Sequence, residues 1–431
     1  MDEKIILPVS GQFEITERCN HNCFHCYNHS RDFPNEDGSN LEIIAKKICD
    51  EQVFNITLTG GEPFLREKSL FNIAEIFNKY NVDFEINTNL TLVSGENLQR
   101  LKKSGLKSIL TSIHSYDENL HDSITQKRGS FKNFLRGIES VKKESIPLSV
   151  NMVVTSLNKN QIFDTGSFLV NNYKIESFCA TPIVCSPERK NDLLRIKKED
   201  YVRALDNLIE LKETYGINVD SLHPPIPCIF EKLGRYSSFL VRSCVAGIHT
   251  FTISPSGEVR PCSNSGENYG NILNKSLKEI IHKMEKWRGK DLIPESCSPC
   301  DYVDKCRGGC RVMAASLKDY CSSHPFCSGP ITKAIDKKEE SKSSGIPKES
   351  YVKLSGGALK VREEENGLVT AYLSPRINAL MKKEESNLLR LMTSNVGDLK
   401  EISDKYNLPL GQLQKYARFF ADRKFITIKF K

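Results

Sequence analysis

Three cysteines near the N-terminus constrain the fold of this chain more than any other feature. Cys19, Cys23 and Cys26 have the spacing C-x3-C-x2-C and follow a strand-like segment at residues 12–18. Three thiolates on one short loop can hold three irons of a cubane [4Fe–4S] cluster. The loop has no fourth cysteine, so one iron would keep a free position, as the metal of a catalytic site does. A zinc site is the alternative, because two histidines of the same loop could complete it.

A glycine pair follows the second strand-like run, residues 55–59. Gly60 and Gly61 allow the backbone to approach a ligand closely, and Glu62 and Pro63 come next. With these two motifs the chain resembles the radical S-adenosylmethionine (SAM) enzymes. The resemblance implies that the open iron binds the amino and carboxylate groups of SAM, and that the Gly-Gly-Glu-Pro edge binds the amino group. It also implies reductive cleavage of SAM to a 5′-deoxyadenosyl radical, which abstracts hydrogen from a substrate.

The same resemblance implies further contacts with SAM. Tyr27, directly after the third cysteine, would lie near the adenine, and Ser112 would hydrogen-bond the ribose. Arg128 could reach the carboxylate, since a guanidinium matches a carboxylate in bidentate fashion. Asn89 is a further candidate, from a Thr-Asn turn like that of the family. His114 stands where the family usually has an acidic residue. A strand-end serine and a surface arginine are the alternatives for Ser112 and Arg128.

The composition places these motifs in a multidomain globular protein. The chain has 431 residues, of which 39% are hydrophobic and 27% charged, a size that suggests two or three domains. The sequence contains no run long enough for a membrane span, and the N-terminus does not have the pattern of a signal peptide. Fifteen cysteines without a secretion signal favour metal ligation in a reducing compartment, so we expect a cytoplasmic protein without membrane partners.

Strand-like and helix-like segments alternate up to about residue 215. The strands are predicted at 12–18, 55–60, 83–89, 108–114, 147–155 and 177–184, and the helices near 40–50, 68–80, 94–104, 131–144, 158–172 and 198–214. This alternation predicts βαβ units and a parallel sheet of the α/β class. Six units fit the partial (β/α)6 TIM-like barrel of the family. In parallel barrels reactive groups collect at the C-terminal strand ends, where the motifs above lie.

A second group of cysteines occupies residues 228–327. Cys244, Cys262, Cys297, Cys300, Cys306, Cys310 and Cys327 have the order and spacing of the SPASM domain, a C-terminal extension of many radical SAM enzymes. The resemblance implies two auxiliary [4Fe–4S] clusters, and therefore three clusters in the chain. A hairpin is predicted from Thr250 to Arg260, before the second of these cysteines. The alternative is a pair of structural zinc sites, because Cys-x2-Cys pairs also bind zinc.

The SPASM resemblance also implies which cysteines share a cluster. Cys297, Cys300, Cys306 and Cys327 would hold a distal cluster, and Cys244, Cys262 and Cys310 a proximal one. The motif does not fix the fourth proximal ligand. Cys228 is the candidate, because it lies just upstream of Cys244. Without it the proximal cluster would have an open iron that could touch the substrate.

The C-terminal residues form a separate block behind a polar segment. Residues 333–349 resemble a linker, and Asn366-Gly367 between two apolar runs predicts a hairpin. Three helical patterns follow, the first containing Leu380, and a closing strand is expected at Phe425–Ile428. These elements suggest an α+β, winged-helix-like unit. Residues 351–431 carry fifteen basic and nine acidic side chains, a net charge of +6.

Two ligands fit a basic winged helix. It could bind DNA. It also resembles the recognition elements (RRE) of ribosomal peptide (RiPP) maturases, in which a precursor's leader peptide adds a strand to a sheet edge. We favour the peptide, since acidic leader segments would be attracted to a basic groove, and expect no nucleic acid partner.

We therefore expect a radical SAM/SPASM peptide maturase that installs a cross-link or related modification. The expected domains are a radical SAM barrel at 1–225, a SPASM domain at 226–332, a linker at 333–349 and a peptide-binding domain at 350–431. The expected partners are a precursor peptide and a flavodoxin or ferredoxin-type electron donor. The alternatives are a radical SAM enzyme acting on a tetrapyrrole or on a sulfatase-type protein, and an iron–sulfur sensor that binds DNA.

Overall fold

The chain forms two compact units. One unit is Ser10–Ala334, and the other joins Met1–Val9 to Ile335–Lys431. The computed structural model describes residues 7–28, 38–189, 191–332, 350–355, 358–364, 367–374, 377–395 and 397–429, so the predicted linker, 333–349, lies outside the described residues. Within these ranges, no helix combines the length and the apolar character that crossing a membrane requires.

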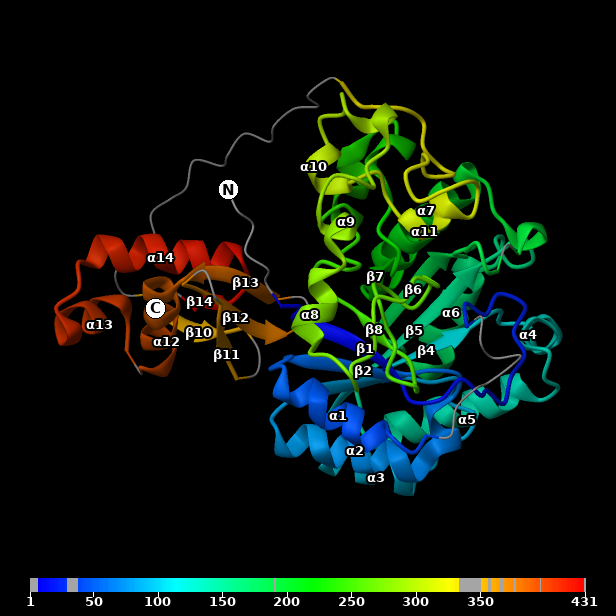
Figure 1. Cartoon of the computed structure of the whole chain (residues 1–431), viewed down its shortest axis with the longest axis horizontal. Helices are drawn as coiled ribbons and strands as arrows, with labels where there is room; N and C mark the ends of the chain where they lie inside the picture. The colour runs from blue at the N-terminus through cyan, green and yellow to red at the C-terminus, as the bar shows by residue number, and fades with distance from the viewer. Residues whose placement is uncertain are drawn as a thin grey trace. The chain divides into compact units, whose positions relative to one another are not determined.

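A nine-stranded sheet is the centre of the larger unit (Figure 1). Its order is β7-β6-β5-β4-β3-β2-β1-β8-β9. The strands are β1 (Ser10–Glu14), β2 (Asn55–Thr59), β3 (Asp83–Asn87), β4 (Leu106–Ile113), β5 (Leu148–Val154), β6 (Ser177–Pro182), β7 (Asn218–Asp220), β8 (Thr252–Ile253) and β9 (Val259–Arg260). All neighbours pair in parallel except β8 and β9. The six predicted parallel strands and the predicted hairpin are therefore confirmed.

Helices connect the first six strands and continue to β7. They are α1 (Leu41–Asp50), α2 (Glu67–Lys79), α3 (Gly95–Lys103), α4 (Glu118–Thr125), α5 (Ser130–Lys143), α6 (Ile162–Tyr173) and α7 (Lys198–Tyr215). Local signals fix several ends: Ser94 and Asn97 form a capping box at the start of α3, and Gly216 ends α7 in the left-handed conformation. The alternation confirms the partial-barrel α/β fold. Only α4 was not predicted, because its eight residues show little apolar periodicity.

The two faces of the sheet differ in polarity because side chains alternate along each strand. The register places polar side chains on one face: Gln12, Glu14, Thr57, Thr59, Glu85, Asn87, Ser112, Asn151 and Thr181. The other face is apolar and buried, with Phe13, Ile56, Leu58, Phe84, Ile86, Ile113, Val150, Met152 and Phe178. Burial of the apolar face under helices leaves the polar face to line the inside of the open barrel.

The cysteine-rich region adds short elements to the same unit. They are α8 (Leu277–His282), α9 (Glu285–Arg288), α10 (Val303–Cys306) and α11 (Arg311–Ala315), with 3-10 helices η1 (Pro63–Arg66), η2 (Asp192–Leu194), η3 (Pro227–Ile229), η4 (Leu233–Phe239) and η5 (Glu295–Cys297) across the unit. Strand β8 pairs with β1, which the sequence did not predict. Gly11 permits this pairing, since a Cβ there would lie 2.4 Å from the ring of Phe251.

In its described residues, the smaller unit forms two antiparallel sheets and three helices. Its elements are β10 (Tyr351–Leu354), β11 (Lys360–Glu363), β12 (Leu368–Ser374), β13 (Ile377–Lys382), α12 (Lys383–Ser394), α13 (Leu399–Tyr406), α14 (Leu410–Asp422) and β14 (Ile426–Lys429). Strand β10 pairs with β14, and β12 pairs with both β11 and β13. The predicted hairpin is confirmed, although Asn366 of its turn lies outside the described residues. The likeness to a winged helix stays a prediction.

One predicted helix in this unit begins later than expected. Leu380 was assigned to it but lies in β13, paired with Thr370. The helix α12 starts at Lys383, where Glu385 accepts a hydrogen bond from the Lys382 backbone. The preceding residues alternate in burial, which is the pattern of a strand.

The N-terminal residues belong to the smaller unit. The buried guanidinium of Arg362 donates to the backbone oxygens of Pro8 and Leu7 and pairs with Glu364. Residues 7–9 therefore group with the C-terminal unit, whereas the sequence assigned them to the barrel.

A buried ion pair joins the first strand to the cysteine-rich region. Glu14 of β1 and Arg260 of β9 are each 7% exposed and form a hydrogen-bonded salt bridge. Burial raises the pKa of Glu14, and the charge of Arg260 partly offsets this rise. Because Cys262 lies two residues after Arg260, the pair fixes the start of that loop against the barrel.

We predict that Arg260→Met lowers the free energy of unfolding by about 3–5 kcal/mol, because it leaves a buried carboxylate without its cation. Denaturant unfolding, followed by circular dichroism, measures this loss. With the pKa of Glu14 raised, its protonated form is favoured in the folded state, so the loss should be smaller at pH 6 than at pH 8. The double variant E14Q/R260M should recover part of the stability, and equal stability of R260M and the parent would contradict the prediction.

Candidate functional site

The cysteine loop lies directly after β1 and is held by a helix that the sequence did not predict. Cys19, Cys23 and Cys26 are half-buried. Backbone amides of the loop donate to the C-terminal end of α4: Asn22 N–H to Thr125 at 3.0 Å and Phe24 N–H to Ile124 at 3.1 Å. The end of α4 therefore determines how the loop presents its thiols.

The glycine pair after β2 lies against the backbone that leads into this loop. The amides of Gly61 and Glu62 donate to the carbonyls of Thr16 (2.7 Å) and Arg18 (2.8 Å). A Cβ at Gly60 would lie 2.2 Å from the Thr16 oxygen, and one at Gly61 would lie 1.9 Å from the Arg18 oxygen. The glycines are thus required by contact between two strand ends, whatever ligand also approaches them.

Glu62 connects this edge to the end of β3. Its buried carboxylate accepts hydrogen bonds from Phe64 N–H (3.1 Å), Thr88 Oγ1 (2.8 Å) and Asn89 N–H (2.8 Å). Pro63 occupies the first position of η1, which Glu62 caps. Burial raises the pKa of Glu62 to about 7, although all three hydrogen bonds lower it. Glu62 therefore caps η1, and the same carboxylate also positions Thr88 and Asn89.

Asn89 completes the connection back to the cysteine loop. Its Nδ2 lies 2.7 Å from Asn20 Oδ1 and 3.9 Å from the sulfur of Cys19, and its Oδ1 accepts from Thr91. The structure therefore brings together the cysteine loop, the Gly-Gly-Glu edge and Asn89. Asn20 and Thr91 were not singled out from the sequence, because only the folded chain shows them in this network.

The other three residues predicted to contact SAM differ in how far they are buried. Tyr27 is half-buried, lies close to Thr59 and Glu14, and has a pKa raised by burial. Ser112 is half-buried on the polar face, in register with Asn151 of β5. Arg128 is exposed in the turn between α4 and α5 and forms no ion pair with any described residue. Their contacts with SAM stay predictions.

Histidines gather beside the cysteine loop. His114 is 4% exposed, and its ring centroid lies 4.4 Å from that of His25 and 5.3 Å from that of His121. Burial lowers the pKa of His21 and of His121 to about 4, so both rings are neutral near pH 7. Ligand atoms of Cys23, His25 and His114 lie within 4.8 Å of one another. These three side chains are the ligands that a zinc ion would use here. Because Cys23 is one of them, zinc and an iron–sulfur cluster could not both bind at this loop.

The proximal cysteines form one group in the structure. Burial raises the pKa of Cys262 and of Cys310. The charge of Cys244 raises both further, and that of Cys310 raises the pKa of Cys262, which reflects the proximity of the three thiols. Beside them, the buried guanidinium of Arg311 gathers the backbone oxygens of Gly308, Gly309, Leu292, Tyr320 and Ser322. Arg311 was not predicted, since a single arginine in a loop gives no signal of its partners.

The distal group contains one more cysteine than predicted. Electrostatic coupling connects Cys297, Cys300, Cys306 and Cys327. The Cys228 sulfur lies 3.9 Å from that of Cys327. Their hydrogen bond raises the pKa of Cys228 and lowers that of Cys327. The structure thus places Cys228 with the distal cysteines and not, as the sequence suggested, with the proximal ones, because η3 carries it to Cys327.

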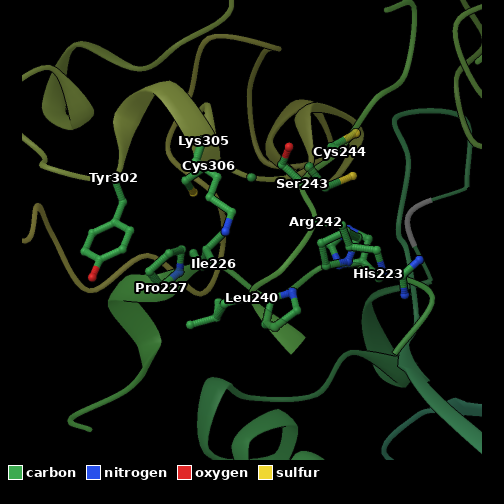
Figure 2. A pocket seen from close by; sticks show the side chains of 14 residues that line it. His223, Ile226, Pro227, Leu240, Arg242, Ser243, Cys244, Tyr302, Lys305 and Cys306 are labelled. Atoms are coloured by element: carbon green, nitrogen blue, oxygen red, sulfur yellow. The ribbon is translucent and has the colours of Figure 1, made fainter. Parts of the chain in front are cut away.

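A pocket lies between the two cysteine groups (Figure 2). Cys244 and Cys310 of the proximal group and Cys306 of the distal group line it, together with His223, Pro224, Pro225, Ile226, Pro227, Leu240, Arg242, Ser243, Tyr302, Lys305 and Gly309. Figure 2 shows Cys244 and His223 on one side of the pocket and Tyr302 on the other. The donor sets fit iron–sulfur clusters, since groups of three or four thiols on short loops are the ligands that such clusters take.

Comparison with known families agrees with the prediction for the N-terminal cysteine loop and with that for the second group of cysteines, at residues 228–327. Residues 13–169 match the Radical SAM superfamily. Residues 244–301 match SPASM, an iron–sulfur cluster-binding domain. A radical SAM domain binds SAM and a [4Fe–4S] cluster, and a SPASM domain binds auxiliary clusters.

Similar proteins include two curated relatives. The AdoMet-dependent heme synthase of Methanosarcina barkeri is 26% identical over 73% of this chain and 95% of the relative. The PqqA peptide cyclase of Bradyrhizobium diazoefficiens is 26% identical over 82% of this chain and 95% of the relative. The crystal structure of Streptococcus suis SuiB bound to its precursor peptide SuiA aligns with a TM-score of 0.58 at 18% identity, over 74% of this chain and 75% of SuiB, which indicates a shared fold.

We predict that Glu62→Gln weakens SAM binding about tenfold, because the new amide would point a donor at Asn89 N–H and lose about 1–3 kcal/mol. Equilibrium binding of SAM to the reconstituted protein measures the change. Glu67→Gln is the matched control, since Glu67 is exposed at the start of α2. An unchanged dissociation constant in E62Q would show that Glu62 does not position the SAM site.

Proposed function

We propose that this chain, a radical SAM enzyme with a SPASM iron–sulfur domain, modifies a ribosomally made precursor peptide. The proposal is supported by the similarity to a PqqA peptide cyclase over most of both chains and by the fold shared with SuiB, whose structure contains a precursor peptide. The expected product carries a cross-link or a related modification.

One observation carries this proposal. In a single unit, Glu62 and Asn89 connect the Gly-Gly-Glu edge to Cys19, and a second cysteine field lies on the same sheet through β8 and β9. When bound, SAM and its cluster supply a 5′-deoxyadenosyl radical that abstracts hydrogen from the substrate. The residues of the chain hold and orient these groups: three thiolates take the irons, and the polar face of the sheet offers hydrogen bonds to SAM and substrate.

The smaller unit would recognise the leader of the precursor. Its β13 is an outer strand of the described three-stranded sheet, and Leu380 on that strand is 39% exposed. An extended peptide could add a strand here through its backbone and place an apolar side chain against Leu380. The net charge of +6 over residues 351–431 favours an acidic leader.

A tetrapyrrole substrate is the second candidate, because similarity to an AdoMet-dependent heme synthase covers nearly all of that relative. This match extends over 73% of the present chain, so it leaves part of the chain without a counterpart. A separate C-terminal unit with an exposed sheet edge is more useful for binding a peptide than for binding a small ring.

We also propose the setting in which the enzyme works. A flavodoxin or ferredoxin-type protein would supply the electron, and the location would be cytoplasmic, since the free thiols of both cysteine fields require reducing conditions. Residue 226 remains the proposed start of the SPASM domain.

Reconstituted protein should contain about twelve irons, four for each of three clusters. Replacing Cys19, Cys23 and Cys26 by alanine should remove about a third of the iron and all formation of 5′-deoxyadenosine. Metal analysis and chromatography of the reaction measure both. Cys321→Ala is the control, because Cys321 is exposed and outside both predicted ligand sets. Zinc in place of iron in the parent would sink the proposal.

Leu380→Asp should weaken binding of the precursor encoded beside the gene about tenfold, since it removes apolar contact and repels an acidic leader. Fluorescence anisotropy with the labelled peptide measures this. Leu193→Asp, at a leucine 93% exposed in the larger unit, is the matched control and should bind as the parent does. Conversion of a tetrapyrrole in the absence of any peptide interaction would favour the second candidate.

A further inference from the structure

The proximal cysteines lack a fourth partner of their own kind. Cys244, Cys262 and Cys310 form the group, and the candidate Cys228 lies beside Cys327 instead. A [4Fe–4S] cluster takes four ligands from a protein when it is closed, so a group of three thiols leaves one iron for another donor.

His223 is held next to this group by the end of β7. Asp220 forms a 2.8 Å ion pair with Arg242, which also donates to the backbone oxygen of Ser221 at 2.5 Å. Arg242 precedes Cys244 by two residues, and His223 follows Ser221 by two. These contacts bring the segment that carries His223 to the segment that carries Cys244.

A second set of contacts places His223 near Cys310. Its ring stacks on that of His324 with centroids 6.0 Å apart. The ring of His324 lies beside Gly309, where a Cβ would meet it at 3.1 Å, and Gly309 directly precedes Cys310. The backbone oxygen of His223 also accepts from Tyr201 Oη (2.8 Å) and Ser221 Oγ (3.0 Å), so its position is fixed.

One nitrogen of the His223 ring is free to coordinate a metal. Its Nδ1 is buried and has no hydrogen-bond partner among the described residues, although buried polar atoms in proteins are nearly always paired. His223 lines the pocket together with Cys244 and Cys310. Neutral imidazole nitrogen is a good ligand for iron.

We propose that His223 is the fourth protein ligand of the proximal auxiliary cluster and coordinates iron through Nδ1. This inference rests on the proposed proximal set of three cysteines and not on the identity of the substrate. A cluster closed in this way has no iron free for a substrate thiolate, so its role is to pass an electron and not to bind the peptide.

His324 provides an internal comparison. Its Nδ1 accepts a hydrogen bond from Phe326 N–H at 3.1 Å, which leaves the ring proton on Nε2. The Nε2 of His324 also has no hydrogen-bond partner among the described residues, but coordination there would move the ring proton to Nδ1 and break the bond from Phe326. His223 has no such bond at Nδ1 to lose, so we assign the ligand to His223 and not to His324.

The test uses full-length protein with Cys19, Cys23 and Cys26 replaced by alanine, so that only auxiliary clusters contribute. After reduction, pulsed electron paramagnetic resonance on protein labelled with [15N]histidine should show one strongly coupled nitrogen. His223→Gln should abolish this coupling, and His324→Gln should retain it. His223→Cys should restore a closed cluster without nitrogen coupling, which Mössbauer spectra report. Absence of the coupling in the parent, or its survival in H223Q, overturns the proposal.

A separate measurement tests the proximal set itself. In the same background, replacing Cys244, Cys262 and Cys310 by alanine should remove about four irons and the nitrogen coupling together. Retention of all iron would show that the proximal set is wrong, and the assignment of His223 would fail with it. Neither result depends on which peptide or ring the enzyme modifies, so failure of the proposed function remains distinguishable.

Discussion

The close approach of two backbones, residues 16–18 after β1 and the glycine pair after β2, is the constraint on which the site depends. Amides of Gly61 and Glu62 bind carbonyls of Thr16 and Arg18, and neither glycine has room for a side chain. This contact fixes where the cysteine loop departs from the sheet. It also orients Glu62, whose carboxylate holds the end of β3 and, through Asn89, returns to Cys19. Three consecutive strand ends are thereby joined into one rigid edge.

Most of the fold could be predicted from the sequence because its signals are local. Period-two strands and period-3.6 helices alternate, and turn residues mark their ends, so each of the six predicted strands overlaps an observed one, although the first was predicted at 12–18 and lies at Ser10–Glu14. The failures concern short or long-range features. Helix α4 is too short to show periodicity, and the pairing of β8 with β1 joins residues more than two hundred positions apart. Leu380 was misplaced because β13 ends at Lys382 and α12 begins at Lys383, with no turn residue between them to mark the boundary.

The candidate site was predictable where chemistry and spacing coincide and unpredictable where only proximity matters. The cysteine spacings and the Gly-Gly-Glu edge were visible as patterns. The grouping of Cys228 with Cys327 was not, since spacing along the chain does not reveal which loop η3 approaches. The same holds for Arg311 and for the neutral histidines beside each cysteine field, whose partners come from distant segments. Such residues carry no local signature, because their function depends on burial.

Burial of the thiols sets a condition on how the clusters assemble. It raises the pKa of Cys19 to about 11, that of Cys306 to about 11 and that of Cys310 to about 12. Iron binds thiolates, so each cysteine must release its proton as the metal enters. Burial also raises the pKa of Cys244 and Cys297, and the positive charge of Arg311 opposes the rise for these two and for Cys310. This opposing charge favours the release. Since the same guanidinium ties together five backbone oxygens, the loops that hold the ligands and the charge that stabilises them depend on one residue.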